Sequence, residues 1–279
     1  MLARDIRKGY ILRVSSCCME EIDRLRTEIR DTQVIIFAGG SAKRFGYIER
    51  PKPLLPLGET TLIDYQMDIF LRSGFRRFVF LLGHMAEMIE KHLKKMYKTR
   101  DYVISLDPDL PKVGKGKALK NAILNGAIDT GRRGLIAFPD DVFLDRSLPY
   151  RLVSHHLFAM RNHDTVITVL AVSGRNYPFG VIREIDSYGR ALSFEEKPFI
   201  PLVTSTGVCV VEPEFYSVAK KNINMNDKGA VEFESIILPE FAKKRKISVM
   251  TIPPNIWFPV NDPKEYEQLL NTIKRIKSC

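Results

Sequence analysis

Apolar runs and helical repeats alternate along most of this chain. The run from Val34 to Phe37 is typical of a buried parallel strand, and similar runs follow at residues 78–82, 102–106 and 135–138. Helical spacing predicts helices between these runs, at residues 84–97 and 116–127. Strands that alternate with helices in this way predict an α/β fold with a doubly wound, mostly parallel sheet of the Rossmann-like kind.

The second half of the chain has a different pattern. It contains β-rich segments at residues 165–172, 180–183, 191–194 and 203–211, with the turn signal Asp186-Ser187-Tyr188-Gly189 between the middle two. Helices are predicted at residues 212–222, 231–243 and 262–277. We therefore expect a β-rich subregion beside the parallel sheet.

The segment before the first strand looks like an addition to the fold. Met19, Ile22, Leu25 and Ile29 predict a short amphipathic helix that ends just before residue 33. This pattern divides the chain into an N-terminal extension, residues 1–32, and one domain, residues 33–279. The helix is a plausible contact in a homo-oligomer.

Composition excludes several classes of protein. A chain of 279 residues that is 45% hydrophobic can bury a full core. The net charge of +10 is spread along the chain instead of gathering on one face or arm, so a nucleic-acid partner is not expected. No apolar run approaches the ~20 residues of a membrane span, and the charged first residues do not make a signal peptide. The four cysteines lack Cys-x-x-Cys spacing, which favours a reducing cytoplasm.

The loop after the first strand carries the strongest chemical signal. Ala38-Gly39-Gly40-Ser41 follows the strand directly, and about twenty residues pass before helical spacing resumes at Leu62. Glycines let backbone amides approach an anion, and Lys43, Arg44 and Lys52 add cationic groups. These features predict a cradle for a polyphosphate. An ordinary turn is the alternative, because the spacing fits neither a Walker loop nor a dinucleotide fingerprint.

Two adjacent carboxylates, Asp140 and Asp141, follow the apolar strand at residues 135–138. Such a pair suits Mg²⁺, which binds through one or two carboxylates together with substrate phosphates. A turn or a helix cap is the alternative. The position favours the metal, because this strand is expected to end at the same edge of the sheet as the first loop.

The first loop resembles the signature of the sugar-1-phosphate nucleotidyltransferases, Gly-Gly-x-Gly-x-Arg followed by Lys-Pro-x-x-Pro. The matching residues are Gly39, Gly40, Arg44, Lys52, Pro53 and Pro56, whereas Ala42 stands where a second glycine is usual. The resemblance implies that Ala38, Gly39, Gly40 and Ser41 bind the nucleotide, and that Arg44 and Lys52 are catalytic. It also implies that Asp140 is the Mg²⁺ ligand and Asp141 its neighbour.

A second segment, Gly114-Lys115-Gly116, resembles the part of this family that holds the base and ribose. The resemblance implies that Gly114 and Gly116 bind the nucleotide, although Lys115 and Gly116 replace the family's usual residues. A flexible helix start is the alternative. Just upstream, Asp107 and Asp109 are able to accept hydrogen bonds from a base, and we assign Asp109 to the nucleotide site.

Later motifs imply a sugar phosphate and a second metal ligand. Tyr177 to Val181 and Glu195 to Pro198 resemble the family's sugar-binding pair, which implies that Gly180, Glu196 and Gly207 contact the sugar and that Lys197 binds its phosphate. A solvated strand end is the alternative for the second segment. In the closing motif, Pro259 stands where the family has a metal-binding Asp, and Asn261 or Asp262 is the expected substitute.

The resemblance extends over about residues 33–270 and implies an enzyme. It would join an NTP to a sugar 1-phosphate by Mg²⁺-dependent in-line attack on the α-phosphorus, releasing pyrophosphate. Two alternatives remain open. The Arg-Phe-Gly sequence at residues 44–46 also resembles nucleotidyltransferases that act on the molybdenum cofactor or another small alcohol. The departures at Ala42, Lys115 and Pro259 fit a non-catalytic sensor of nucleotide sugars or a regulatory subunit.

Overall fold

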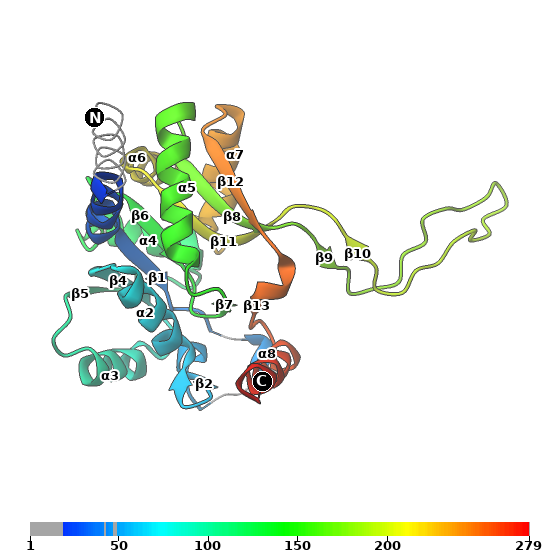
Figure 1. The fold of residues 1–279 in the computed structure, drawn as a ribbon, viewed down its shortest axis with the longest axis horizontal. Coiled ribbons are helices and arrows are strands. Elements are labelled where there is room, and N and C mark those ends of the chain that lie inside the picture. Colours follow the sequence, from blue (N-terminus) through cyan, green and yellow to red (C-terminus); the bar gives the residue numbers. More distant parts are fainter. Residues whose placement is uncertain (1–18, 42, 47–48, 279) are drawn as a thin grey trace, which may run out of the picture.

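A seven-stranded sheet forms the centre of the molecule (Figure 1). The computed structural model describes residues 19–41, 43–46 and 49–278, so that residues 1–18 of the expected extension and the departure at Ala42 lie outside it. The strand order is β12-β8-β11-β6-β1-β4-β5. The bounds are β1 (Gln33–Phe37), β4 (Arg77–Leu82), β5 (Tyr102–Leu106), β6 (Gly134–Ala137), β8 (Ile167–Val172), β11 (Thr204–Val211) and β12 (Ile247–Ile252).

The pairing of these strands confirms the predicted fold class. β1 is parallel to β4 and β6, β4 is parallel to β5, and β8 is parallel to β12. Only β11 runs in the opposite direction in this sheet, antiparallel to both β6 and β8. Val34, Ile35 and Ile36 are fully buried because β1 lies in the middle of the sheet with helices on both faces.

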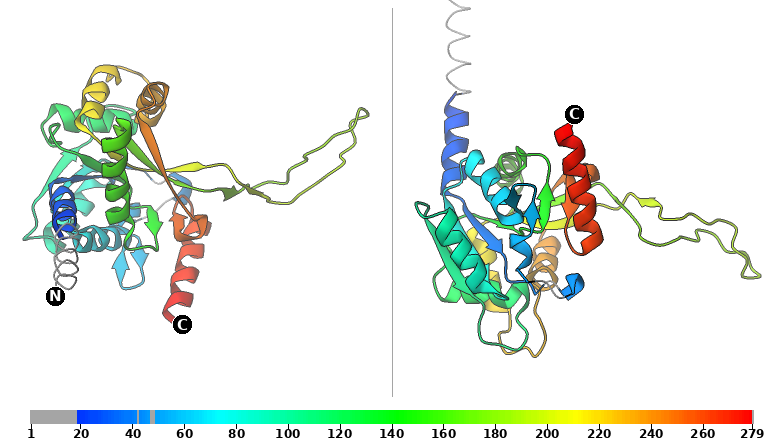
Figure 2. Two further views of the ribbon diagram at one scale, coloured as in Figure 1. Left: turned by 45° about the horizontal axis from the view of Figure 1, so that its top comes forward. Right: turned by 90° about the horizontal axis from the view of Figure 1, so that it is seen from below.

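Helices cover both faces of the sheet (Figures 1 and 2). One face carries α2 (Leu62–Ser73), α5 (Leu148–His163) and the helix of residues 19–31, which ends just before β1 as predicted. The other face carries α4 (Gly114–Leu124), α6 (Pro213–Asn222) and α7 (Phe233–Lys243). α3 (Ala86–Met96) lies beside α2, where the His92 ring is 2.9 Å from the Asp64 carboxylate. None of the described helices combines the length and apolar character that a membrane span needs.

Short elements surround the carboxyl edge of the sheet. The first connection contains η1 (Lys43–Phe45), η2 (Lys52–Leu54), β2 (Pro56–Leu57) and β3 (Thr60–Thr61). β7 (Asp141–Phe143) pairs with β13 (Trp257–Pro259), which follows η3 (Pro254–Ile256). α8 (Pro263–Ser278) completes the chain, and its Leu269 belongs to a small second core with Leu57, Val142 and Val260.

An extended arm, residues 174–203, leaves the body between β8 and β11 (Figures 1 and 2). Its base contains β9 (Arg175–Asn176) paired with β10 (Phe199–Ile200). The strands predicted at residues 180–183 and 191–194 are corrected here, since only isolated bridges join Val181 to Glu195 and Ile185 to Ala191. A two-stranded ribbon without a second layer has little to hold a regular ladder. The predicted turn is present, with the Gly189 amide donating to the Asp186 carbonyl at 3.0 Å.

A buried lysine ties α4 to the loop before α7. Lys117 is only 1% exposed, and its ammonium group donates to the carbonyls of Lys112, Asp227 and Gly229 at 2.7–2.9 Å. An ammonium group has three N–H donors, and the three carbonyls accept from all of them. These hydrogen bonds therefore offset the cost of burying the charge. The arrangement fixes two loops that the next section places around a cavity.

Replacing Lys117 by Met should destabilise the protein. The substitution keeps the volume but leaves three carbonyls without their donor, and we expect a loss of about 3 kcal/mol in the free energy of unfolding. Urea denaturation followed by circular dichroism measures this loss. The matched control is Lys94→Met on the exposed side of α3, which should change stability by less than about 0.5 kcal/mol. Equal effects of the two substitutions would contradict the role of the buried lysine.

Candidate active site

A cavity of about 660 Å³ opens at the carboxyl edge of the sheet. Its floor consists of the residues that follow three parallel strands: residues 38–41 after β1, Asp107 after β5 and residues 138–141 after β6. Thr206 and Gly207 of β11, the segment of residues 110–115, and Asn261 form the walls. This is where an open α/β sheet binds its ligands.

The cavity brings together most of the residues expected at the phosphate and metal sites. The predicted site residues that line it are Ala38, Gly39, Gly40, Ser41, Lys52, Gly114, Asp140, Gly207 and Asn261. Others lie outside the lining: Arg44, Asp109, Gly116, Gly180, Glu196, Lys197 and Asp262. Of these, Arg44 is exposed on η1 and Asp109 is exposed in the loop after β5.

Three glycines have a steric reason for their identity. A Cβ on Gly39 would lie 2.8 Å from the Gly83 nitrogen, where the ends of β1 and β4 approach each other. Gly114 has φ of 72° and its added Cβ would lie 2.5 Å from the Val231 carbonyl oxygen, so that a side chain is excluded twice. Gly116 also packs against Val231, with its amide 2.6 Å from the same oxygen. This close packing is sufficient to explain the glycine at position 116, so the glycine does not require a role in nucleotide binding.

Lys52 and Asp140 form an ion pair that connects the first loop to the end of β6. The Val260 amide donates to the Asp140 carbonyl at 2.8 Å, which brings Asn261 to the same wall of the cavity. Asp262 has another partner, since its carboxylate accepts from the Glu265 amide at 2.9 Å and caps α8. Of the three residues expected to hold a metal, Asp140 and Asn261 therefore line the cavity, whereas Asp262 does not.

Asp141 lies beside Asp140 in a more enclosed position. It accepts a hydrogen bond from the Trp257 indole at 2.9 Å across the β7–β13 pair. Burial, followed by the charge of Asp140, raises the pKa of Asp141, against the opposing effects of Trp257, Lys52 and Lys115. Two neighbouring carboxylates in this enclosed position therefore disfavour each other's charged form.

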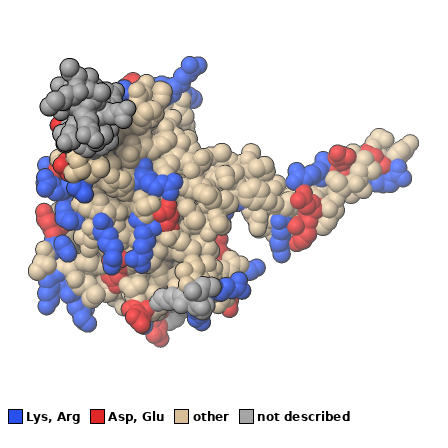
Figure 3. Space-filling view, viewed as in Figure 1, with Lys and Arg blue, Asp and Glu red and all other residues tan. Residues whose placement is uncertain are grey.

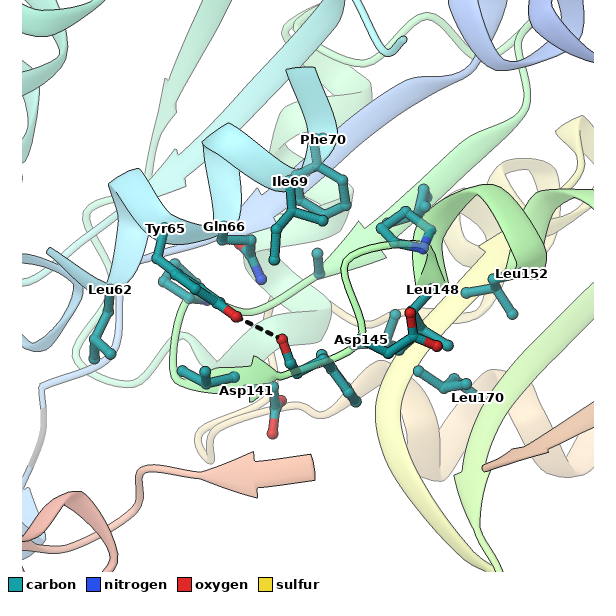
Figure 4. A pocket seen from close by; sticks show the side chains of 17 residues that line it. Leu62, Tyr65, Gln66, Ile69, Phe70, Asp141, Asp145, Leu148, Leu152 and Leu170 are labelled. Carbon is teal, nitrogen blue, oxygen red and sulfur yellow. Dashed lines mark hydrogen bonds between the residues drawn. The ribbon is translucent and has the colours of Figure 1, made fainter. Parts of the chain in front are cut away.

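A small apolar cavity of about 40 Å³ lies beside β7, lined by residues of β7, α2 and α5 (Figure 4). Tyr65 donates from its hydroxyl to the Phe143 carbonyl at 2.9 Å, the dashed line in Figure 4. Leu62, Ile69 and Leu148 supply apolar walls. This packing supports the strand that carries Asp141 and has no charged group suited to a phosphate.

A cluster around Lys115 is the part of the site that the motifs did not predict. Its ammonium group is paired with Glu234 and lies 3.4 Å from the Glu232 carboxylate, above the Phe138 ring at 5.2 Å. Burial lowers the pKa of Lys115, but the two glutamates outweigh it and the net pKa is raised. Lys115 and Glu232 both line the cavity. The signal available in the sequence was a lysine between two glycines at a helix start.

Three of the residues expected to bind the sugar phosphate, Gly180, Glu196 and Lys197, lie together on the arm, whereas Gly207 lines the cavity. A Cβ added to Gly180 would lie 3.1 Å from the Glu196 carboxylate, and Lys197 lies 3.6 Å from the same side chain. Both Glu196 and Lys197 have side chains that are 61% exposed. Lys197 has φ of 49°, a left-handed conformation that is uncommon for residues other than glycine. The three residues are thus neighbours of one another, outside the lining of their own chain's cavity.

The chain belongs to the nucleotidyl transferase family, because the model of that family matches residues 33–275. Its fold is also similar to that of solved structures. The chain superposes with a TM-score of 0.64 on a Bacillus anthracis protein assigned as a glucose-1-phosphate thymidylyltransferase, in complex with a sucrose, at 18% identity over 86% of this chain and 94% of the other. With HddC from Yersinia pseudotuberculosis the TM-score is 0.60 at 17% identity, over 87% and 99% of the two chains.

Curated relatives agree with this family. The mannose-1-phosphate guanylyltransferase catalytic subunit beta of Drosophila melanogaster is 20% identical over 240 residues, 84% of this chain and 61% of the relative. The glucose-1-phosphate adenylyltransferase 1 of Vibrio cholerae is 25% identical over 248 residues, 79% of this chain and 59% of the relative. The chain therefore spans about three-fifths of the length of these relatives.

Asp107 should make stability depend on pH. Burial raises the pKa of Asp107 from 3.8 to about 6. A pKa that is higher in the folded protein contributes stability at low pH, and this contribution is lost as the pH rises through about 6. Relative to Asp107→Asn, which does not titrate, the wild type should gain on the order of 1 kcal/mol between about pH 7.5 and about pH 5.

Urea unfolding of both proteins at the two pH values measures the difference. The exposed neighbour gives a matched control, because Asp109→Asn removes a carboxylate from the same loop but not from the half-buried position. A constant difference between wild type and Asp107→Asn across this range would show that the carboxyl group is not perturbed by folding.

Proposed function

We propose that this protein joins an NTP to a sugar 1-phosphate and releases pyrophosphate. The observation that carries the proposal is the meeting of the Gly39–Ser41 loop, the Lys52–Asp140 pair and Gly207 in one cavity at the carboxyl edge of the sheet. The names of its relatives support the substrate class, since guanylyl, adenylyl and thymidylyl transfer are each paired there with a sugar 1-phosphate.

The phosphates of the NTP are proposed to lie against the first loop. Ala38 follows β1 and its amide donates to the Leu81 carbonyl at 2.9 Å, and a Cβ added at Gly40 would meet no atom within 4 Å. Backbone amides without nearby side chains can approach phosphate oxygens closely. The adjacent Lys52, which is mostly buried, supplies a positive charge at the same end of the cavity.

A divalent cation fits the donor set of this site. The Asp140 carboxylate and the Asn261 amide are oxygen donors, which Mg²⁺ prefers, and the phosphates of the substrate would complete its coordination. Lys52 provides a positive charge that pairs with the Asp140 carboxylate. When bound, the cation would neutralise phosphate charge and orient the reacting groups. In the described residues no group of three or more His, Cys, Asp or Glu forms a site by itself.

The chain's own residues then have defined tasks in the transfer. The sugar phosphate oxygen attacks the α-phosphorus in line and pyrophosphate leaves, so the protein must mainly position the groups and offset their charge. Lys52 stabilises the charge that develops on pyrophosphate. Arg44, exposed on η1 in the first connection, is proposed to reach the same group when the NTP is bound.

Pyrophosphate release tests the reaction directly. The protein is incubated with each of several NTPs and each of several sugar 1-phosphates, in Mg²⁺ and then in EDTA. We expect release from a restricted set of pairs and its loss in EDTA. Asp140→Ala should lower turnover by at least ~100-fold, as does the loss of a principal electrostatic group elsewhere. A folded protein that is silent with every pair would exclude this function.

Metal binding distinguishes Asp140 from Asp262. Because Asp140 faces the cavity and Asp262 caps α8, Asp140→Asn should weaken Mn²⁺ binding by at least about tenfold, as the loss of an anionic ligand does. Asp262→Asn should leave the affinity within about twofold, since Asn caps a helix as well as Asp. Isothermal titration calorimetry measures both, and a large loss in the second variant would make Asp262 the ligand.

A further inference from the structure

The arm, residues 174–203, has the most apolar surface in the described part of the molecule. Ten of the twenty large hydrophobic side chains that are exposed there lie between residues 177 and 203, including Phe179, Tyr188 and Phe194. Tyr188 at the tip is 84% exposed and Phe194 is 67% exposed. Such a concentration of exposed apolar side chains marks an interaction site. A bare two-stranded ribbon is also only marginally stable in water, so a partner would stabilise it.

The base of the arm holds it in the outward direction seen in Figures 1 and 2. The Arg175 guanidinium lies 4.7 Å from the centre of the Trp257 ring and 3.7 Å from the Glu265 carboxylate. Gly174 packs against the Phe199 ring, where an added Cβ would lie 2.4 Å from the nearest carbon. These contacts oppose a rotation that would fold the arm back over the cavity of its own chain.

Charge indicates what kind of surface the arm would meet. Residues 174–203 contain four basic and four acidic side chains and are neutral, although the whole chain carries a net charge of +10. Several of these charges are paired within the arm, as in Arg183–Glu195 and Arg190–Asp186. Figure 3 shows the two signs interspersed along the arm. A neutral arm has no net attraction for a nucleic acid or an acidic membrane, but it can dock on a basic body without repulsion.

We infer that the arm docks on a second copy of this chain and completes the partner copy's active site with Glu196 and Lys197. The inference rests on the proposed function, since it assigns to Glu196 and Lys197 the sugar-phosphate contacts that the cavity of their own chain lacks. Two copies related by a two-fold axis would exchange arms reciprocally and bury both apolar ribbons. Fully extended, the roughly thirteen residues from the base to the tip span about 40 Å, enough for the tip to cross the face of a domain of this size. Glu196 and Lys197 lie near the base, beside the hydrogen bond from the Tyr177 amide to the Pro198 carbonyl at 2.8 Å, so they would meet the partner's cavity close to the two-fold axis.

Mixed dimers of two inactive variants test the exchange. Asp140→Ala has a defective cavity and an intact arm, and Lys197→Ala has the reverse. Both are co-expressed with different affinity tags, and pyrophosphate release is measured with the wild-type substrate pair. If arms act in trans, random pairing gives half mixed dimers with one working site each, or about a quarter of wild-type activity. If each arm serves its own chain, the mixture stays as inactive as the single variants, and the inference fails.

Sedimentation velocity supplies a measurement that does not depend on activity. The wild type should be a dimer, and Phe194→Glu should shift it to a monomer at the same concentration. Phe158→Glu is the matched control, because Phe158 on α5 is equally exposed at 63% but lies on the body. A wild type that stays monomeric overturns the inference. A dimer without pyrophosphate release would support the arm interface and reject the proposed function instead.

Discussion

The parallel pairing of β1 with β4 on one side and β6 on the other is the constraint on which the site depends. The register of these pairs brings Phe37 opposite Leu81 and Ile36 opposite Ala137, so that the three strands end at the same level. The chain must turn at this level with glycines, because at Gly39 and Gly83 the two backbones are too close for side chains. Everything that lines the cavity floor therefore derives its position from one buried strand.

The walls of the cavity are held by charged groups in unusual surroundings. Lys117 is buried and satisfied by three carbonyls, whereas Lys115 lies between Glu232 and Glu234, each of which has a buried Oε2 without a hydrogen-bond partner. The hydrogen bonds of Lys117 stabilise two loops. The glutamates beside Lys115 leave hydrogen-bond acceptors at the cavity wall that the folded chain does not use. Differences of this kind separate residues that serve stability from residues available to a ligand.

The sequence predicted the sheet and much of the cavity floor, because both follow from local patterns. Apolar runs such as Val34 to Phe37 identify buried strands, and the edge where they end is set by the fold class. Side-chain partners at long range are different, since no local pattern indicates that Lys117 meets Asp227 or that Asp262 turns to cap α8. The direction of the arm also could not be predicted, because the alternation at residues 180–194 indicates extended segments but not the surface against which they pack.

β11 is the one antiparallel strand of the seven-stranded sheet, and this gives the arm an unusual freedom. Antiparallel neighbours such as β8 and β11 need only a two-residue turn between them, whereas parallel neighbours need a long crossover. The thirty or so residues of the arm are thus an insertion that the sheet does not require. Evolution could lengthen, shorten or recompose this segment without disturbing a single strand pairing, so related chains could differ in assembly while keeping the same catalytic floor.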